Sequence, residues 1–519
     1  MPKPLQLRLG VFMVLCLFFM GNAFGQITLV NSQTNSNATV ASLAINKPTG
    51  LAIGNLMIAN ITNRGTASDP TTVPSGWTKL TSYLVASAGR WAYIAYKVAD
   101  ISDVAATTFT FGWAANQTGI AGGITAFSGV NTTTTGGIEV TGTFATNTTA
   151  TIIPTTITTL TNNAVVLFLA QISNIGTTFT AGNWTVGGNT MTQSYVVYSS
   201  VEPSAGLAYL NQVTAGATGA GSKAISASQR WGGILLSLKP LIAPTIGSFT
   251  VPSKTYGDAP FNLTAPSSNS SGAFTYTSSN TSVATISGTT VTIVGAGTST
   301  ITATQAANGI YSSGSTTATL TVAKAPLTIT AANQSVSYGT AVATVTGAGT
   351  YTPTGFVNSE TASVIGGTAT YSTTYTTITS AGTVGVTITP IVTSLTATNY
   401  SFSAANGTIT ITKANSTITA TGTTSYTYTG LIQGPATSNV TGSTGAVTYS
   451  YSGTGGTTYG PSSTRPVNAG TYQVEATVAT DTNYNGATST PLAFTIATAP
   501  LTITGLTADN KAYDGNTIA

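Results

Sequence analysis

The chain has 519 residues, a length of about three to five ordinary domains, and only 5% of its residues are charged, with a formal net charge of +4. With no histidine and one cysteine, it cannot build a histidine-based catalytic triad, an imidazole metal site, a disulfide framework or a zinc cluster. The 15 basic residues are spread along the chain, which excludes the basic patch that nucleic-acid binding requires.

Residues 1–25 have the pattern of a secretory signal peptide. Lys3 and Arg8 provide the charged start, and residues 11–20 form an apolar segment too short to span a bilayer. Residues 23–25 (Ala-Phe-Gly) fit a cleavage site that leaves Gln26 as the first residue of the mature chain, and a cut after Ala23 is the alternative. We therefore expect a secreted protein, attached to the cell surface, with no membrane-spanning segment after signal cleavage.

The remainder of the chain predicts an all-β fold. Thr, Val, Ile and Tyr alternate with small polar residues in short runs such as 92–98, 290–294 and 472–478, which Gly, Asn, Ser and Pro interrupt. Because β-branched side chains fit a pleated surface better than a helix, this composition favours strands throughout.

The tryptophans mark the first domain. All five lie before residue 240, and a proline-flanked linker follows at residues 242–244. The many short strands in this segment predict a jelly-roll-like β-sandwich over residues 26–240. The tryptophans are Trp77, Trp91, Trp113, Trp184 and Trp231.

From residue 243 the chain repeats with a period of about 85 residues. Three motifs recur in the same order: a Tyr-Gly motif, an Ala-Gly-Thr motif and an Asn/Tyr pair. Their positions are 256–257, 338–339 and 428–430 for Tyr-Gly, 296–298, 381–383 and 469–471 for Ala-Gly-Thr, and 308/311, 399–400 and 483–484 for Asn/Tyr. We refer to residues 243–323, 324–412 and 413–498 as the first, second and third repeats.

This period suits one immunoglobulin-like β-sandwich of about seven strands per repeat. We expect Ala-Gly-Thr to be a turn that leads into a strand, with the glycine at positive φ, and the tyrosine of Tyr-Gly to pack its ring at a sheet corner. Residues 499–504 repeat residues 325–330 letter for letter, so residues 499–519 are expected to be the truncated start of another domain.

These motifs resemble those of known bacterial families. The first repeat, with K-T-Y-G-D at 254–258 and a Ser-Ser-Asn segment at 278–288, resembles bacterial immunoglobulin-like units. The second and third repeats resemble MBG-type domains, and residues 499–519, with Tyr-Asp-Gly at 513–515, resemble the start of a YDG-type domain.

Residues 26–240, with Pro-Ser-Gly-Trp at 74–77 and Arg-Trp at 230–231, resemble a lectin-like jelly roll. Together these resemblances imply a surface or secreted adhesin-like protein, of a kind often found in gliding Bacteroidota, in which a C-terminal sorting domain would direct export. The resemblances bring no catalytic residues to this chain.

Two tryptophans are the candidate ligand contacts. Trp77 follows Pro-Ser-Gly and Trp184 follows Gly-Asn, and both are loop contexts that favour exposed rings able to stack on sugars. The alternative is burial, because large aromatic side chains are usually inside. Trp91 and Trp231 lie beside alternating runs and are expected in the core.

Asp100 and Asp103 are the candidate metal ligands, since hard carboxylate oxygens suit calcium. The alternative is that they cap the backbone of a turn. Glycine pairs at 122–123 and 187–188 are expected to be turns between strands.

The sequence therefore predicts a non-enzymatic adhesin-like protein. Its N-terminal sandwich would contact extracellular glycans or surface proteins without a cofactor, apart from calcium if the aspartates bind it. Two alternatives stay open: a purely structural stalk or matrix protein, and the accessory region of an enzyme whose catalytic module lies beyond residue 519.

Overall fold

The computed structural model describes residues 26–86, 89–174 and 176–507. The predicted signal peptide and residues 508–519 of the predicted YDG-type start lie outside the described residues. The chain divides into two compact units, which are residues 26–252 with 260–292 and 299–320, and residues 253–259 with 293–298 and 321 onwards. Strands make up 54% of the structure and helices only 4%, so the all-β prediction is confirmed.

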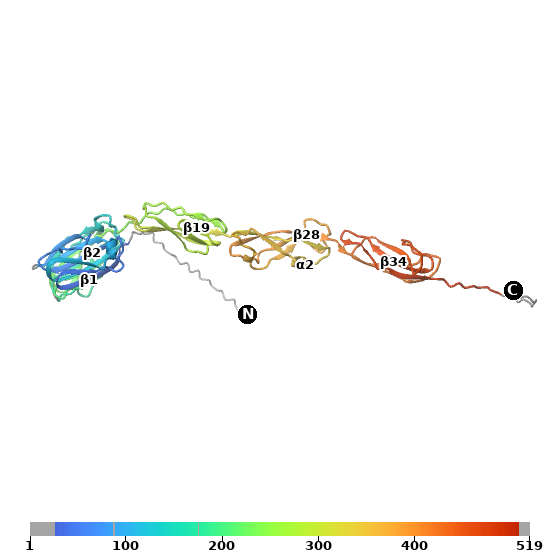
Figure 1. Ribbon diagram of the computed structural model, residues 1–519, viewed down its shortest axis with the longest axis horizontal. Coiled ribbons are helices and arrows are strands. Elements are labelled where there is room, and N and C mark those ends of the chain that lie inside the picture. Colours follow the sequence, from blue (N-terminus) through green and yellow to red (C-terminus); the bar gives the residue numbers. More distant parts are fainter. Residues whose placement is uncertain (1–25, 87–88, 175, 508–519) are drawn as a thin grey trace, which may run out of the picture. The chain divides into compact units, whose positions relative to one another are not determined.

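The first sheet of the N-terminal sandwich comes from the first five strands, in the order β1-β5-β2-β4-β3, and all neighbouring strands are antiparallel. Figure 1 labels two of them, β1 and β2. A short helix, α1 (Ile101–Ala105), connects β4 to β5. The strands are β1 (Thr28–Asn46), β2 (Leu56–Arg64), β3 (Thr78–Ala86), β4 (Arg90–Val98) and β5 (Thr108–Ser128).

The second sheet has seven strands in the order β10-β11-β12-β9-β14-β6, with β7 paired to β14. A separate two-stranded ribbon joins β8 (Thr158–Thr159) to β13 (Gly216–Ala217), and the 3-10 turn η1 (Thr135–Gly137) precedes β6. The seven strands are β6 (Ile138–Thr141), β7 (Ala145–Ile152), β9 (Ala164–Ile172), β10 (Trp184–Val186), β11 (Asn189–Tyr198), β12 (Ser204–Gln212) and β14 (Gly221–Leu238).

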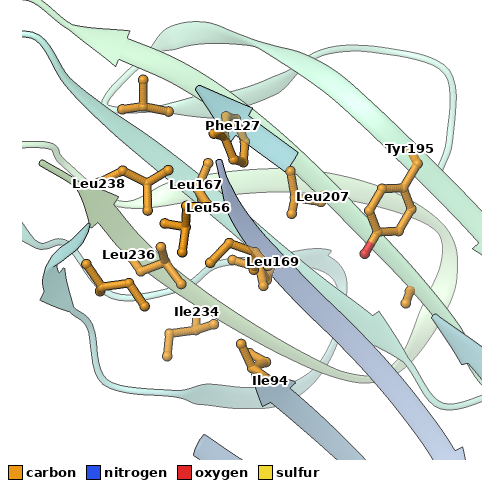
Figure 2. Packing of buried hydrophobic residues seen from close by; sticks show 14 of the residues in the cluster. Leu56, Ile94, Phe127, Leu167, Leu169, Tyr195, Leu207, Ile234, Leu236 and Leu238 are labelled. Carbon is orange, nitrogen blue, oxygen red and sulfur yellow. The ribbon is translucent and has the colours of Figure 1, made fainter. Parts of the chain in front are cut away.

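The main core lies between these two sheets. Leu56 and Phe127 from the first sheet meet Leu167, Leu207 and Leu236 from the second, and all five are fully buried (Figure 2). Each such side chain contributes about 1.5–3 kcal/mol by leaving water. The core therefore holds the two sheets face to face.

The central strands are buried on both faces, not on one. Every residue of β9 is buried, and so is β2 up to its last residue. Further apolar clusters cover the outer faces of the two sheets. This explains why β9 reads as a continuous apolar run and not as an alternating one.

The glycine pair at 122–123 lies inside β5 and not in a turn, so this part of the glycine prediction was wrong. A Cβ on Gly123 would stand 2.5 Å from the ring of Tyr195, which reaches across from the second sheet. The pair at 187–188 does form the turn between β10 and β11, with both residues at positive φ.

The three repeats are β-sandwiches of the immunoglobulin-like kind. In the first repeat a sheet β15-β21-β20-β17 accompanies a sheet β16-β19-β18. The strands are β15 (Lys254–Thr255), β16 (Phe261–Asn262), β17 (Phe274–Ser278), β18 (Ala284–Ser287), β19 (Thr290–Ile293), β20 (Gly297–Gln305) and β21 (Gly314–Ala323).

The second repeat combines the sheets β24-β22-β27 and β23-β28-β26-β25, with α2 (Val342–Gly347) and η2 (Ala362–Val364) in its connections. Its strands are β22 (Ala325–Ala331), β23 (Gln334–Ser337), β24 (Tyr351–Thr354), β25 (Thr370–Thr373), β26 (Thr387–Ile391), β27 (Tyr400–Ala405) and β28 (Gly407–Thr412).

The third repeat has the sheet β31-β37-β34-β33, with β36 on β34, and the pairs β29–β35 and β30–β32. Its strands are β29 (Ala414–Asn415), β30 (Thr417–Thr421), β31 (Ser425–Thr427), β32 (Thr437–Thr441), β33 (Val447–Thr454), β34 (Gly470–Val478), β35 (Tyr484–Asn485), β36 (Ala487–Thr488) and β37 (Leu492–Ala497).

Candidate functional site

Trp184 is buried, with 1% of its surface exposed, so the expected exposed ring was wrong. The ring stacks on Phe179 at a centroid distance of 5.3 Å, and its Nε1 donates to Gln193 Oε1 at 2.9 Å. Gly206 of β12 makes room for it, because a Cβ there would stand 2.9 Å from the indole. The ammonium of Lys223 lies over the ring at 5.4 Å, so Trp184 is enclosed on its faces.

Trp77 is also buried, at 8% exposure, and its predicted exposure was wrong too. Its ring meets Phe109 and Phe111 edge to face, at 5.8 and 5.5 Å. The loop bends inward because Lys97 Nζ donates to the carbonyl of Ser75 at 2.8 Å. Apolar packing against the outer face of the first sheet therefore outweighs the loop context.

Asp100 and Asp103 come together, as the sequence predicted, but around a lysine. Lys97 Nζ lies 2.8 Å from Asp103 Oδ1 and 3.1 Å from Asp100 Oδ2. Asp100 Oδ1 accepts the N–H groups of Ser102 and Asp103, and Asp103 Oδ2 accepts the N–H of Asp100, which makes a capping box for α1. The capping alternative is confirmed.

This arrangement gives the aspartates little to offer a calcium ion. Burial lowers the pKa of Lys97, but its hydrogen bonds to Asp103 and Asp100 outweigh this and raise the pKa, so the group is a cation at neutral pH. The Ser102 hydroxyl first, and then Lys97, lower the pKa of Asp100. Over residues 26–507, gaps excepted, no group of three or more Asp, Glu, Cys or His side chains is placed to hold a metal.

A second charged cluster ties the two sheets of the sandwich together. Glu202 of the β11–β12 loop is buried, and its Oε2 accepts from Arg90 Nη2 at 2.6 Å and lies 3.5 Å from Arg64 Nη1. Arg90 Nε also donates to the carbonyl of Ser173 at 2.8 Å. Because the arginines lie on strands of the first sheet and Glu202 and Ser173 lie in loops next to strands of the second, these contacts link the two sheets.

Two exposed isoleucines stand near the Lys97 cluster. Ile53, in the loop before β2, is 65% exposed, and Ile101, the first residue of α1, is 76% exposed. The Gly54 N–H donates to the carbonyl of Ala99 at 2.8 Å, which joins the two segments. Large apolar side chains that remain exposed together are more informative than single ones, because such patches contact partners. No sequence motif pointed to them.

The repeated motifs converge on a joint within the second unit. The linker residue Ala323 accepts the N–H of Tyr256 at 2.9 Å, where β15 runs parallel to the end of β21. Two residues later, Ala325 donates to the carbonyl of Asn399 at 2.9 Å and pairs in parallel with Tyr400. The linker is therefore held by a Tyr-Gly motif before it and an Asn-Tyr motif after it.

Side chains complete this first joint. The rings of Tyr256 and Tyr400 meet edge to face at 5.7 Å, and both hydroxyls bind the carboxylate of Glu360, at 3.1 and 2.5 Å. Asn399 Oδ1 accepts the N–H of Ala296, from the Ala-Gly-Thr motif, at 2.9 Å. Burial, and next the hydrogen bond to Glu360, raise the pKa of Tyr400.

The second joint repeats these contacts. Tyr338 donates its N–H to the carbonyl of Thr412 at 2.8 Å, and its ring meets Tyr484 edge to face at 5.4 Å. Asn483 Oδ1 accepts the N–H of Ala381 at 3.0 Å, as Asn399 does for Ala296. The three recurring motifs therefore build the same contact twice.

At both joints a lysine at the start of the following repeat donates to a backbone carbonyl of that same repeat, close to its asparagine. Lys324 Nζ donates to the carbonyl of Ala397 at 2.7 Å, and Lys413 Nζ donates to that of Asp481. The pKa of the Asp481 carboxyl is lowered to about 2, first by the N–H of Thr444 and also by the N–H groups of the following Asn-Tyr pair. An acid thus orders the loop that carries the asparagine.

The sequence shows the three recurring motifs but not that those of one repeat contact those of the next. The expected positive φ is present at Gly297 and Gly382 but not at Gly470, and a strand starts inside the motif in the first and third repeats (β20 and β34) but not in the second. The constant spacing between motifs was the signal that they share one place, but only the pairing of strands shows that the motifs of one repeat meet those of the next. Glu360 carries no repeat signal and was missed.

One family model matches part of the chain. Residues 262–314, within the first repeat, match the bacterial Ig-like domain, group 2. No curated protein matches the chain. The match agrees with the immunoglobulin-like resemblance drawn from the first repeat.

Solved structures give distant similarities. Drosophila N-cadherin EC1-3 is 10% identical with a TM-score of 0.15, and covers 49% of this chain and 100% of its own. Sidekick-1 immunoglobulin domains 1-4 are 12% identical with a TM-score of 0.17, covering 68% and 95%. A SusE-like surface-located polysaccharide-binding protein from Bacteroides thetaiotaomicron is 10% identical with a TM-score of 0.14, covering 90% and 72%. These TM-scores are too low to indicate a shared arrangement or a shared function.

Within the described part of the chain, no helix has the length and apolar character needed to cross a membrane.

Proposed function

We propose that this chain is an exported, non-enzymatic spacer protein of the bacterial surface, in which clamped immunoglobulin-like repeats carry an N-terminal β-sandwich. The joint is the observation that carries this proposal. The asparagine, the tyrosines and the linker strand make the same contacts at two successive boundaries between repeats, both within the second unit. A chain whose repeats moved freely would have no need to repeat them.

The proposal also gives the low charge a role. With 5% charged residues, the chain has few long-range attractions that could pull its parts together. Position between repeats therefore depends on short-range contacts, which the joint supplies. The MBG-type and YDG-type assignments, and the signal peptide, belong to the same proposal.

The test measures motion between the second and third repeats. Spin labels on Thr368→Cys and Thr448→Cys, both exposed, report the distance between these repeats in the mature chain, which has no other cysteine once the leader is removed. We expect a narrow distance distribution that broadens when Tyr338→Ala and Asn483→Ala remove the joint. The control is Asn406→Ala, whose side chain bonds within the second repeat. A broad distribution in the parent chain rejects the spacer role.

A second candidate function is adhesion through the N-terminal sandwich, to a glycan or a surface protein. With both predicted tryptophans buried, the exposed pair Ile53 and Ile101 is the feature that favours it. The mature chain would be screened against glycan arrays and surface extracts, in parallel with the double variant Ile53→Ser, Ile101→Ser. The control is Ile153→Ser, which is 50% exposed on another part of the sandwich. Adhesion through this surface requires binding that the double variant loses and the control keeps.

A further inference from the structure

We infer that the third repeat carries an open half of the same joint, and that this half binds an Asn-Tyr strand of a further immunoglobulin-like repeat. The proposal deepens the proposed spacer function and rests on it. Its surface consists of Tyr428, the backbone N–H of Ala469 and residues 499–504. Each of these three has counterparts that make contacts across the two complete joints.

The tyrosine is in place but uncovered. Tyr428 donates its N–H to the carbonyl of Ala497 at 2.8 Å, and β31 runs parallel to β37, as the Tyr-Gly strands do in the other repeats. Yet Tyr428 is 41% exposed, whereas Tyr256 is 6% exposed and Tyr338 is half-buried, each with its ring edge to face against a tyrosine of the next repeat. No ring contact is made by Tyr428 among the described residues. The backbone of Tyr428 therefore matches that of the other two tyrosines, but no second tyrosine ring packs against it among the described residues.

The amide of the Ala-Gly-Thr motif shows the same difference. Ala296 and Ala381 are half-buried, and each donates its N–H to an asparagine side chain of the next repeat. Ala469 is exposed, and within residues 26–507, gaps excepted, its N–H has no acceptor. An asparagine Oδ1 would satisfy this donor as it satisfies the other two.

The strand after the linker gives a third, independent observation. Residues 325–330 and 499–504 have the same sequence, Ala-Pro-Leu-Thr-Ile-Thr. In the second repeat, β22 pairs in parallel with β27, which begins at Tyr400, and Leu327 and Ile329 are fully buried. Their counterparts Leu501 and Ile503 are 89% and 68% exposed. The same apolar strand is therefore buried against a parallel partner in one place and unpaired among the described residues in the other.

These observations specify one occupant. It must present an asparagine side-chain Oδ1 to the N–H of Ala469, the edge of an aromatic ring to Tyr428, and the backbone of a strand to residues 499–504. A strand that opens with Asn-Tyr, folded within its own repeat, provides all three together. The interaction is strand addition to an exposed edge, with the tyrosine and asparagine setting the position. Exposed Leu431 and Ile432, at 71% and 49%, add apolar surface beside Tyr428.

The experiment supplies this occupant from the chain itself. Residues 331–412 are joined to the mature chain after Thr504, in place of residues 505–519, so that a copy of the second repeat follows the third. Hydrogen exchange of the Ala469 amide is measured by NMR with and without the extension. We expect exchange at least tenfold slower in the extended chain. The Asn399→Ala substitution in the added copy should abolish that protection. The Asn406→Ala substitution in the added copy, the control, should leave the protection in place.

The outcomes separate clearly. If the added repeat folds, as judged by protected amides in its copy of β28, but Ala469 exchanges as fast as in the parent chain, the proposal is wrong. An added repeat that fails to fold also counts against it, since the third repeat should support it as the first supports the second. Concentration-dependent protection of Ala469 in the parent chain would instead assign the surface to a second copy. None of these outcomes alters the spin-label test of the second joint, so the two proposals can fail separately.

Discussion

Changing Tyr400 to Phe should loosen the first joint while leaving the second repeat folded. The hydroxyl of Tyr400 donates to Glu360 at 2.5 Å and accepts the N–H of Val357 at 3.1 Å. A hydrogen bond to a charged group contributes about 1.5–3 kcal/mol, and the substitution also leaves the Val357 amide without its acceptor. A loss of about 2 kcal/mol corresponds to about a 30-fold change in a local opening equilibrium.

The matched control is Tyr375→Phe. Tyr375 is in the same repeat and, like Tyr400, is 2% exposed, but its hydroxyl donates to the neutral carbonyl of Thr340 at 2.9 Å. Loss of this hydrogen bond should cost about 0.5–1.5 kcal/mol of stability, and its effect should be confined to the second repeat. The two variants therefore remove the same atom from equally buried rings, and only one of them touches the joint.

Amide hydrogen exchange of the mature chain provides the assay. Tyr400→Phe should speed exchange of the Tyr256 and Val357 amides by about 30-fold, as worked out above. Tyr375→Phe should leave the Tyr256 amide unchanged. Equal effects of both variants on Tyr256, or no effect of Tyr400→Phe, would refute the idea that the hydroxyl–carboxylate contact holds the joint.

Single contacts at Gly257, Asp481 and Lys97 can each be tested by one substitution. Gly257→Ala should cost about 1–3 kcal/mol more than Gly339→Ala in thermal unfolding, because both glycines have positive φ but only at 257 would a Cβ meet a valine, at 2.7 Å; equal costs would contradict this steric argument. The pKa of Asp481 is lowered to about 2 from 3.8, so its stabilisation is present above pH 3.8 and is lost as the pH falls through about 2; Asp481→Asn should remove that pH dependence of amide exchange in the third repeat, and a persisting dependence would assign it to another group. Lys97→Met should cost about 3–5 kcal/mol in calorimetry by leaving a buried carboxylate unpaired, whereas Lys79→Met, at a 44% exposed side chain, should cost under about 1 kcal/mol; similar losses would show that the first pair is not effectively buried.

The sequence was sufficient for the fold class and for the repeats. Thr-rich alternation predicts strands because β-branched side chains fit a pleated, half-buried surface, and the alternating runs at 92–98, 290–294 and 472–478 do lie in β4, β19 and β34, apart from Val294, which follows β19. The repeats were visible because identical contacts at each joint impose the same residues, such as Asn399 and Asn483, at the same spacing. Alternation failed where a strand is buried on both faces, as in β9.

Exposure of single side chains was not predictable from local pattern. Trp184 follows a Gly-Asn turn, which suggests solvent, but Gly206, 22 positions later in the chain, opens the space that buries its ring. Asp100 and Asp103 were correctly placed together, yet the lysine that pairs with them lies on the preceding strand. The space for Trp184 depends on a residue distant in sequence, whereas Lys97 lies only three and six residues before the two aspartates and was overlooked.

The parallel strand pairs inside each repeat have a mechanical consequence. The Tyr-Gly strands β15, β23 and β31 lie near the start of their repeats, and each pairs in parallel with the last strand of the same repeat. Tension that pulls the ends of a repeat apart therefore slides these two strands along each other, and loads their hydrogen bonds all at once. Bonds loaded in shear resist more force than bonds peeled one at a time, so each repeat is built to bear tension along the chain.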